Sequence, residues 1–138
     1  MQELPEWEPG TVCVLSTGGG APHAIPVSTA MRAGPRRVLL ALAPRRETLA
    51  RLRRDPRCAL TVMSGDVACT AHARATIVEE SLPGAERVAA VALEVDAVQD
   101  HLQPRFAVTA GVAWRWTDEE ARASDAAVRV ALAELAHR

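Results

Sequence analysis

Short runs of β-branched and apolar residues, separated by glycine and proline turns, occupy much of the first 84 residues of this chain. Five such runs have the length and composition of strands, namely residues 11–17, 23–32, 37–43, 58–64 and 67–80. The breaks between them include a triple glycine, an Ala-Gly-Pro turn and a Gly-Asp turn. The triple glycine lacks the spacing of the nucleotide-binding glycine motifs, so we interpret it as a hairpin turn rather than a phosphate nest. The pattern favours a mainly β fold.

The C-terminal part of the chain is less uniform. Residues 87–102 fit both a strand alternation and a helical face. We predict a strand, because the β-branched content is high and because the next segment needs a pairing partner. That segment, residues 108–116, alternates along its length and predicts a last strand, with both of its tryptophans on a face that packs in the core or against a second subunit. Residues 117–136 predict the final helix, with Thr117 as its N-cap.

A dense group of positive charge lies between the third and fourth runs, where six of the sixteen basic residues, all arginines, fall within thirteen positions. The segment predicts a short helix with Pro44 in its first turn, and Pro56 ends it. The helix dipole favours the arginines of the last turn, and Arg51 lies four residues from both Glu47 and Asp55. These charges are explained without a ligand.

Arg45 and Arg46 lie at the opposite end of this predicted helix, where the dipole and the unpaired amide groups are positive. Two cations are unfavourable there, whereas an anion would be stabilised by the helix end and by both side chains. We therefore predict a phosphate site at Arg45 and Arg46, with the hydroxyl of Thr48 as a further donor. The alternative is that both arginines extend into water, because charge effects at an exposed helix end amount to only about 0.3–1 kcal/mol.

Composition argues against several classes of function. The net charge is −1, with a single phenylalanine and no tyrosine, so we expect no nucleic-acid partner. No apolar stretch approaches the ~20 residues of a membrane span, and the acidic N-terminus lacks a signal-like apolar core, so we expect a cytoplasmic protein without a membrane partner. The chain has no lysine for a Walker A motif or a Schiff base. Histidines and cysteines lack metal-ligand spacing, so we expect no metal site and three buried free thiols.

The order of parts, with the segments HAIPV, RVLLALA, RRETLARLRRDPR and CALTV, resembles the pyridoxamine 5'-phosphate oxidase-like split-barrel family. The most specific piece is LRRDPRCALTV, which is similar to the family's turn from helix to strand. The resemblance implies one domain over residues 1–138, a six- or seven-stranded antiparallel split β-barrel with a helix inserted after the third strand and a C-terminal helix. It also implies a homodimer that binds FMN, or alternatively the deazaflavin coenzyme F-420, in a groove between two subunits.

Carried over to this chain, the resemblance assigns the cofactor phosphate to the residues that the dipole argument reached independently, Arg45, Arg46 and Thr48. It places one strand segment beside the isoalloxazine ring, at Pro26, Val27 and Ser28. It places a neighbouring wall on the next strand of the site, at Thr61, Val62 and Met63. The chain departs from the family in lacking a lysine near Thr48, an asparagine near Arg51, and the C-terminal catalytic region of true pyridoxamine oxidases.

The resemblance implies an FMN- or deazaflavin-dependent oxidoreductase acting on a small molecule whose identity the residues do not specify. In this hypothesis hydride passes between cofactor and stacked substrate without a protein acid or base, and the protein supplies position and electrostatics. The alternative hypothesis, which the missing lysine, asparagine and catalytic region favour, is a non-catalytic split-barrel module that binds or stores a flavin or has lost it.

Overall fold

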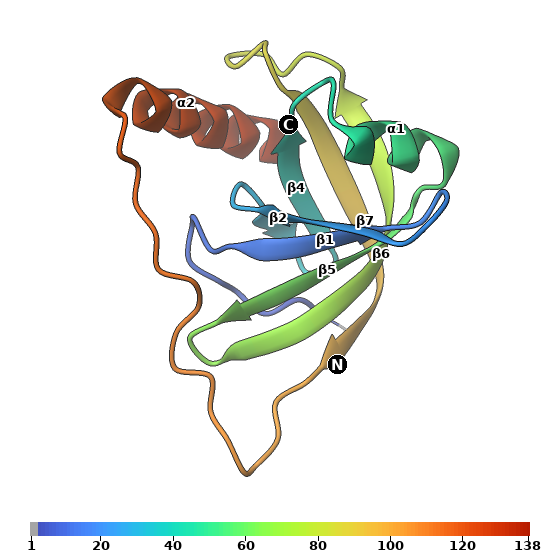
Figure 1. Cartoon of the computed structure of the whole chain (residues 1–138), viewed down its shortest axis with the longest axis vertical. Coiled ribbons are helices and arrows are strands. Elements are labelled where there is room, and N and C mark those ends of the chain that lie inside the picture. The colour runs from blue at the N-terminus through green and yellow to red at the C-terminus, as the bar shows by residue number, and fades with distance from the viewer. Residues whose placement is uncertain (1–2) are drawn as a thin grey trace.

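The computed structural model describes residues 3–138 and contains one seven-stranded antiparallel sheet in the order β2-β1-β5-β6-β7-β4-β3. Its strands are β1 (Cys13–Thr17), β2 (His23–Val27), β3 (Met31–Gly34), β4 (Arg37–Leu42), β5 (Arg57–Ser64), β6 (Val67–Glu79) and β7 (Ala89–Asp100). The helices are α1 (Glu47–Arg54) and α2 (Glu119–Ala136). Figure 1 shows that the sheet curls on itself, with α1 at one end and α2 alongside β4. The predicted mainly β split barrel with two helices is confirmed.

Two hydrophobic clusters pack against the two faces of the sheet. The larger one fills the inside of the curl, where Leu15, Leu60 and Val62 are fully buried and Leu49 of α1 joins them. The smaller one lies between the sheet and α2 and includes Leu39 and Leu132. Strand β4 has apolar side chains on both faces because each face meets one of these clusters.

The predicted strand over residues 23–32 is wrong in one respect, because it is broken into β2 and β3, which lie at opposite edges of the sheet. The break is held by Thr29, whose Oγ1 accepts a hydrogen bond of 3.1 Å from the backbone N–H of Ala41. A side-chain hydroxyl thus binds the backbone where the chain passes between the two edges. As a consequence, α1 follows the fourth strand rather than the third.

The predicted strand over residues 108–116 is also wrong, whereas the strand predicted over residues 87–102 is confirmed as β7. Strand β7 already pairs with β6 on one side and β4 on the other, so it offers no edge to a further strand. Residues 101–118 instead run outside the sheet to α2 (Figure 1). They are tied down by Val108, whose carbonyl accepts from the Asp66 N–H at 2.8 Å, and by Trp114, whose Nε1 donates to the Gly10 carbonyl at 2.9 Å. We call residues 101–118 the strap.

Both helices begin later than predicted. Asp118, not Thr117, caps α2, and its side chain accepts a hydrogen bond from the Glu120 N–H at 3.0 Å. Helix α1 starts at Glu47, and Pro44 lies in a preceding turn that the Arg46 N–H closes on the Ala43 carbonyl at 3.0 Å. Within residues 3–138, neither helix combines the length and the apolarity needed to cross a bilayer.

Candidate functional site

The seam of the split barrel, where the end of β2 approaches the end of β4, contains a cavity of about 190 Å³. Three segments line it, with the residues Pro26, Val27, Ser28, Thr29, Ala41, Leu42, Ala43 and Arg46. The structure therefore brings together the strand segment and the helix-terminal arginine that the sequence predicted as parts of one site. We call this space the seam cavity.

Arg46 is the N-cap residue of α1, and its side chain makes no capping hydrogen bond. Arg45 precedes it in the turn, and both side chains are exposed. In the described part of the chain, residues 3–138, neither guanidinium has a hydrogen bond or an ion pair. The first amide groups of an α-helix have no partner within the helix, so the Glu47 and Thr48 N–H groups add to the positive potential at this end.

The other four arginines of the group all have partners. The triple-glycine turn is a hairpin, as predicted, because it joins the antiparallel strands β1 and β2. Arg51 and Arg54 donate to carbonyls of this turn and fasten it to α1. Arg53 and Arg57 pair with carboxylates. The distances are 3.2 Å for Arg51 Nη1 to Gly18 O, 3.2 Å for Arg54 Nη2 to Gly19 O, 2.7 Å for Arg53 Nη2 to Glu80 Oε2, and 2.8 Å for Arg57 Nη2 to Asp55 Oδ2.

Thr48 faces the protein interior and is only 1% exposed. Its Oγ1 lies 3.2 Å from Nε2 of His23, and Nδ1 of the same imidazole lies 4.0 Å from Oε2 of Glu47. The hydroxyl is thus engaged beneath α1 and does not line the seam cavity. The part of Thr48 that lies at the helix end beside Arg46 is its backbone N–H.

Thr61 and Val62, predicted as a wall of the site, lie on opposite faces of β5 and outside the seam cavity. Pro26 and Thr61 are both cross-strand partners of Val14 on β1, so these three residues form a row on the outer face of the sheet. Val62 points inward and is fully buried, so its side chain belongs to the core. Met63 is 53% exposed near the strap.

Sequence reasoning missed Thr29, Ala41, Leu42 and Ala43 as cavity residues. Three of them have small or aliphatic side chains without reactive chemistry, and their position depends on how the sheet edges meet. The one available signal was the group formed by Pro26, Ser28 and Thr29 inside a predicted strand. Proline and hydroxyl residues in a strand favour a break in its pairing.

The lining of the seam cavity offers one positive charge and few groups that could transfer protons. Of the residues that line the seam cavity, only Arg46 is ionisable.

The three cysteines are free and buried, as predicted. Burial raises the pKa of the Cys13 and Cys58 thiols to about 12 and also raises the pKa of Cys69, so none of them is a thiolate at neutral pH.

Comparison with known proteins identifies this architecture. A sequence model of the family described as "Pyridoxamine 5'-phosphate oxidase" matches residues 2–123. No protein of curated function matches the chain significantly.

Many solved structures share the fold at low sequence identity, including the following three. A Lactobacillus delbrueckii protein, described provisionally as a pyridoxamine 5'-phosphate oxidase, is 17% identical with a TM-score of 0.56 and covers 64% of this chain and 83% of its own. An F-420 reductase is 11% identical with a TM-score of 0.56 and covers 65% and 90%. The flavin reductase PheA2 is 14% identical with a TM-score of 0.53 and covers 68% and 81%. Because the family model spans nearly the whole chain and these folds agree with it, the chain belongs to the pyridoxamine 5'-phosphate oxidase family of split barrels.

Proposed function

We propose that this protein binds a flavin nucleotide, FMN or alternatively the deazaflavin F-420, with the cofactor phosphate at the N-terminal end of α1, and that it acts as an oxidoreductase on a small molecule. One observation carries the proposal: two exposed arginines, without partners among residues 3–138, lie at a helix N-terminus beside the seam cavity. Structural relatives named as an F-420 reductase and a flavin reductase support the cofactor class.

The residues at this corner fit an anionic tail. The guanidinium groups of Arg45 and Arg46 would contact the phosphate, and the backbone N–H groups of Glu47 and Thr48 would donate to it. An anion there offsets the repulsion between two adjacent cations and the positive helix end. In this proposal the Thr48 hydroxyl stays on His23, so it positions the first turn of α1 instead of contacting the ligand.

The flavin ring would lie along the outer row of Pro26, Val14 and Thr61, with backbone groups near Val27 and Ser28 at its polar edge. When bound, the ring supplies hydride transfer, and the protein's part is to hold and orient it. The Thr61 and Thr70 hydroxyls lie 3.0 Å apart on this face and would offer polar contacts to the ring. Val62 would contribute only through its backbone, because its side chain is in the core.

We further propose that a second copy of the chain completes the site. A cavity of about 190 Å³ is smaller than the ~300–1,000 Å³ of ligand pockets, so one copy does not enclose a flavin. Val14 and Met63 on the outer sheet face are 40% and 53% exposed. The strap adds Trp114 and Trp116, each 39% exposed, with ring centroids 5.2 Å apart. Uncovered apolar surface of this kind is typical of a subunit interface.

A charge on the outer face tests this arrangement. We expect the wild-type protein to have the mass of a dimer by size-exclusion chromatography with light scattering, and Val14→Asp to be monomeric because burial of an unpaired carboxylate is costly. Val130→Asp is the matched control, since Val130 is 59% exposed on α2, away from the proposed interface. A monomeric wild type, or an unchanged dimer in Val14→Asp, would contradict the proposal.

A second candidate function, a flavin-binding module without catalysis, is favoured by the seam cavity lining, whose only ionisable residue is Arg46. Turnover of reduced nicotinamide by the flavin-loaded protein separates the two. Oxidation above the rate of free flavin supports the oxidoreductase, and tight binding without turnover supports the module.

Flavin affinity tests the proposed site itself. We expect Arg46→Ala to weaken binding of FMN, or of F-420 if that is the cofactor bound, by about 1.5–3 kcal/mol, the value of one charge-assisted hydrogen bond. Arg53→Ala removes the same charge from the other end of α1 and is the control, because Arg53 pairs with Glu80. Equal affinities of wild type and Arg46→Ala would remove Arg46 from the site.

A further inference from the structure

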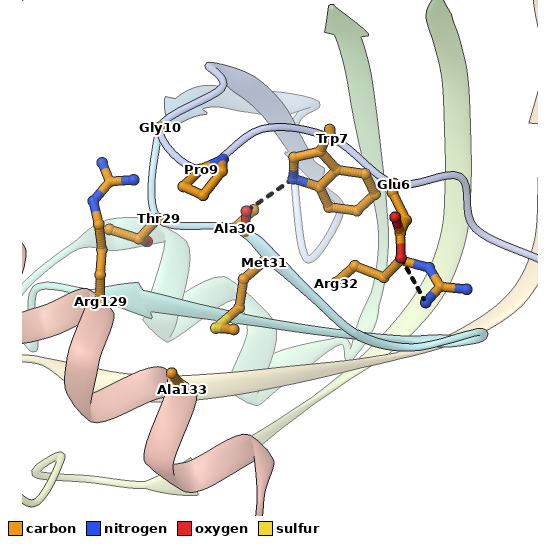
Figure 2. A pocket seen from close by; sticks show the side chains of 10 residues that line it. All are labelled: Glu6, Trp7, Pro9, Gly10, Thr29, Ala30, Met31, Arg32, Arg129 and Ala133. Atoms are coloured by element: carbon orange, nitrogen blue, oxygen red, sulfur yellow. Dashed lines mark hydrogen bonds and ion pairs between the residues drawn. The ribbon is translucent and has the colours of Figure 1, made fainter.

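A second, larger cavity of about 350 Å³ lies between the N-terminal segment, the start of β3 and α2. Ten residues line it: Glu6, Trp7, Pro9, Gly10, Thr29, Ala30, Met31, Arg32, Arg129 and Ala133 (Figure 2). It shares only Thr29 with the seam cavity, and it contains neither Arg45 nor Arg46. We call it the Trp7 cavity. The proposed flavin site does not include it.

The walls of the Trp7 cavity suit an aromatic group. The indole of Trp7 is held in place because its Nε1 donates to the Ala30 carbonyl at 3.0 Å. Figure 2 shows Trp7 and Pro9 on one side, with Met31 and Ala133 on the other. An indole on one side and a methionine side chain on the other are a favourable environment for an aromatic ring. The volume is at the lower end of the ~300–1,000 Å³ range of ligand pockets, which limits the ligand to one or two rings.

The two arginines of the Trp7 cavity lie at opposite ends of it (Figure 2) and differ in how they are engaged. Arg32 donates from Nε to the Leu4 carbonyl at 3.1 Å, and its Nη1 lies 4.0 Å from Oε1 of Glu6. Arg32 thus shares its charge with an exposed carboxylate and a backbone carbonyl.

At the other end, Arg129 keeps free donors. Its Nε pairs with Oδ2 of Asp125 at 2.6 Å, which fixes the orientation of the guanidinium. For Nη1 and Nη2, no hydrogen-bond partner is found among residues 3–138. The side chain as a whole is 26% exposed, so it is partly shielded from water. A Cβ at Gly10 would lie 3.3 Å from Nη1, so the glycine leaves room for the guanidinium beside the cavity.

From these contacts we infer that the Trp7 cavity is a binding site for a small aromatic carboxylate. The carboxylate would accept two hydrogen bonds end-on from Nη1 and Nη2 of Arg129, and the ring would lie between Trp7 and Met31. Arg129 sets the direction of binding, because its Nη1 and Nη2 are the donors that two carboxylate oxygens can reach together. This inference does not depend on flavin binding, since the two sites have different cations.

The charge of the ligand provides the first test, by isothermal titration calorimetry on the full-length protein. We expect 2-naphthoate to bind at least about tenfold more tightly than its neutral counterpart 2-naphthamide, because only the carboxylate pairs with Arg129. Arg129→Gln should remove this preference. Arg122→Gln is the matched control, since Arg122 is on the same helix and pairs with Glu119 outside the cavity. Equal affinity for the two compounds, no binding of 2-naphthoate at millimolar concentration, or an unchanged preference in Arg129→Gln would overturn the inference.

A second variant guards against a folding defect in Arg129→Gln, which leaves Asp125 without its partner. Ala133→Leu keeps every charge and remains compatible with a helix, but it extends a side chain into the Trp7 cavity. We expect it to lose binding of both 2-naphthoate and 2-naphthamide while its thermal unfolding stays cooperative. Unchanged binding of 2-naphthoate to Ala133→Leu would place the ligand elsewhere and overturn the inference.

Discussion

The two ends of α1 contain the same type of residue in opposite situations. At the C-terminal end, Arg51 and Arg54 donate hydrogen bonds to the glycine turn and Arg53 pairs with Glu80. All three guanidinium groups therefore already have partners within the protein. At the N-terminal end, the side chains of Arg45 and Arg46 have no hydrogen bond or ion pair within residues 3–138, although the positive helix end repels them. The difference shows that a cluster of arginines is not by itself a binding site. What distinguishes a candidate site is the subset of charges that the fold leaves without partners.

Removing both arginines at the N-terminal end should have the largest effect. We expect Arg45→Ala combined with Arg46→Ala to weaken flavin binding by about 3–6 kcal/mol, because two charge-assisted contacts are lost. A visible-absorbance titration measures this. The matched control is Arg53→Ala combined with Arg57→Ala, which removes two exposed, paired arginines beyond the ~8 Å screening length at physiological salt.

If both double variants lose the same affinity, binding depends on overall charge and not on the helix N-terminus. That result would abolish the distinction between the two ends. A loss confined to the first variant would sharpen it.

The glycine turn tests the structural role of the other end. Gly19 has φ +74°, and a Cβ there would lie 3.0 Å from the backbone carbonyl oxygen of Arg51. We expect Gly19→Ala to lower the free energy of unfolding by about 1–3 kcal/mol, measured by urea denaturation, because an L-residue is strained in this conformation. Gly20→Ala is a poorer control because its φ is also positive, so we use Gly18→Ala, whose Cβ would meet only Asp55 Oδ2 at 3.5 Å. A stability unchanged from wild type in Gly19→Ala would mean that the turn is not fastened to α1.

The smallest expected effect concerns the residue after α1. The hydrogen bonds from the Arg57 side chain and backbone lower the pKa of Asp55 from 3.8 to about 2. Since the pKa is lower in the folded protein, the contribution of Asp55 to stability is present above about pH 4 and is lost as the pH falls toward 2. The difference in unfolding free energy between wild type and Asp55→Asn should shrink over that interval. An Asp55 pKa near 3.8 by NMR titration would contradict this pairing.

Much of the fold could be predicted because it depends on local patterns. Residues 87–102 form β7, as their β-branched content indicated, and the buried positions of β4 follow from its continuous apolar sequence. The strand predicted over residues 108–116 failed because alternation cannot show that β7 already has two neighbours. The break after β2 was missed because the hydrogen bond between Thr29 and Ala41 joins parts of the chain twelve residues apart.

The candidate site, like the fold, could be predicted from the sequence only in part. The position of Arg46 at the helix end follows from helix signals and charge, and the structure brings it to Pro26, Val27 and Ser28. The inward direction of the Thr48 side chain was not predictable, because it depends on a helix start at Glu47 and on the nearby His23.

The most direct test of the account is a crystal structure of the protein with bound FMN, or with F-420 if that is the cofactor retained. The account predicts that the cofactor phosphate lies within hydrogen-bond distance of the Arg46 guanidinium and of the backbone N–H groups of Glu47 and Thr48. A cofactor phosphate bound elsewhere, with only water at the N-terminal end of α1, would contradict it.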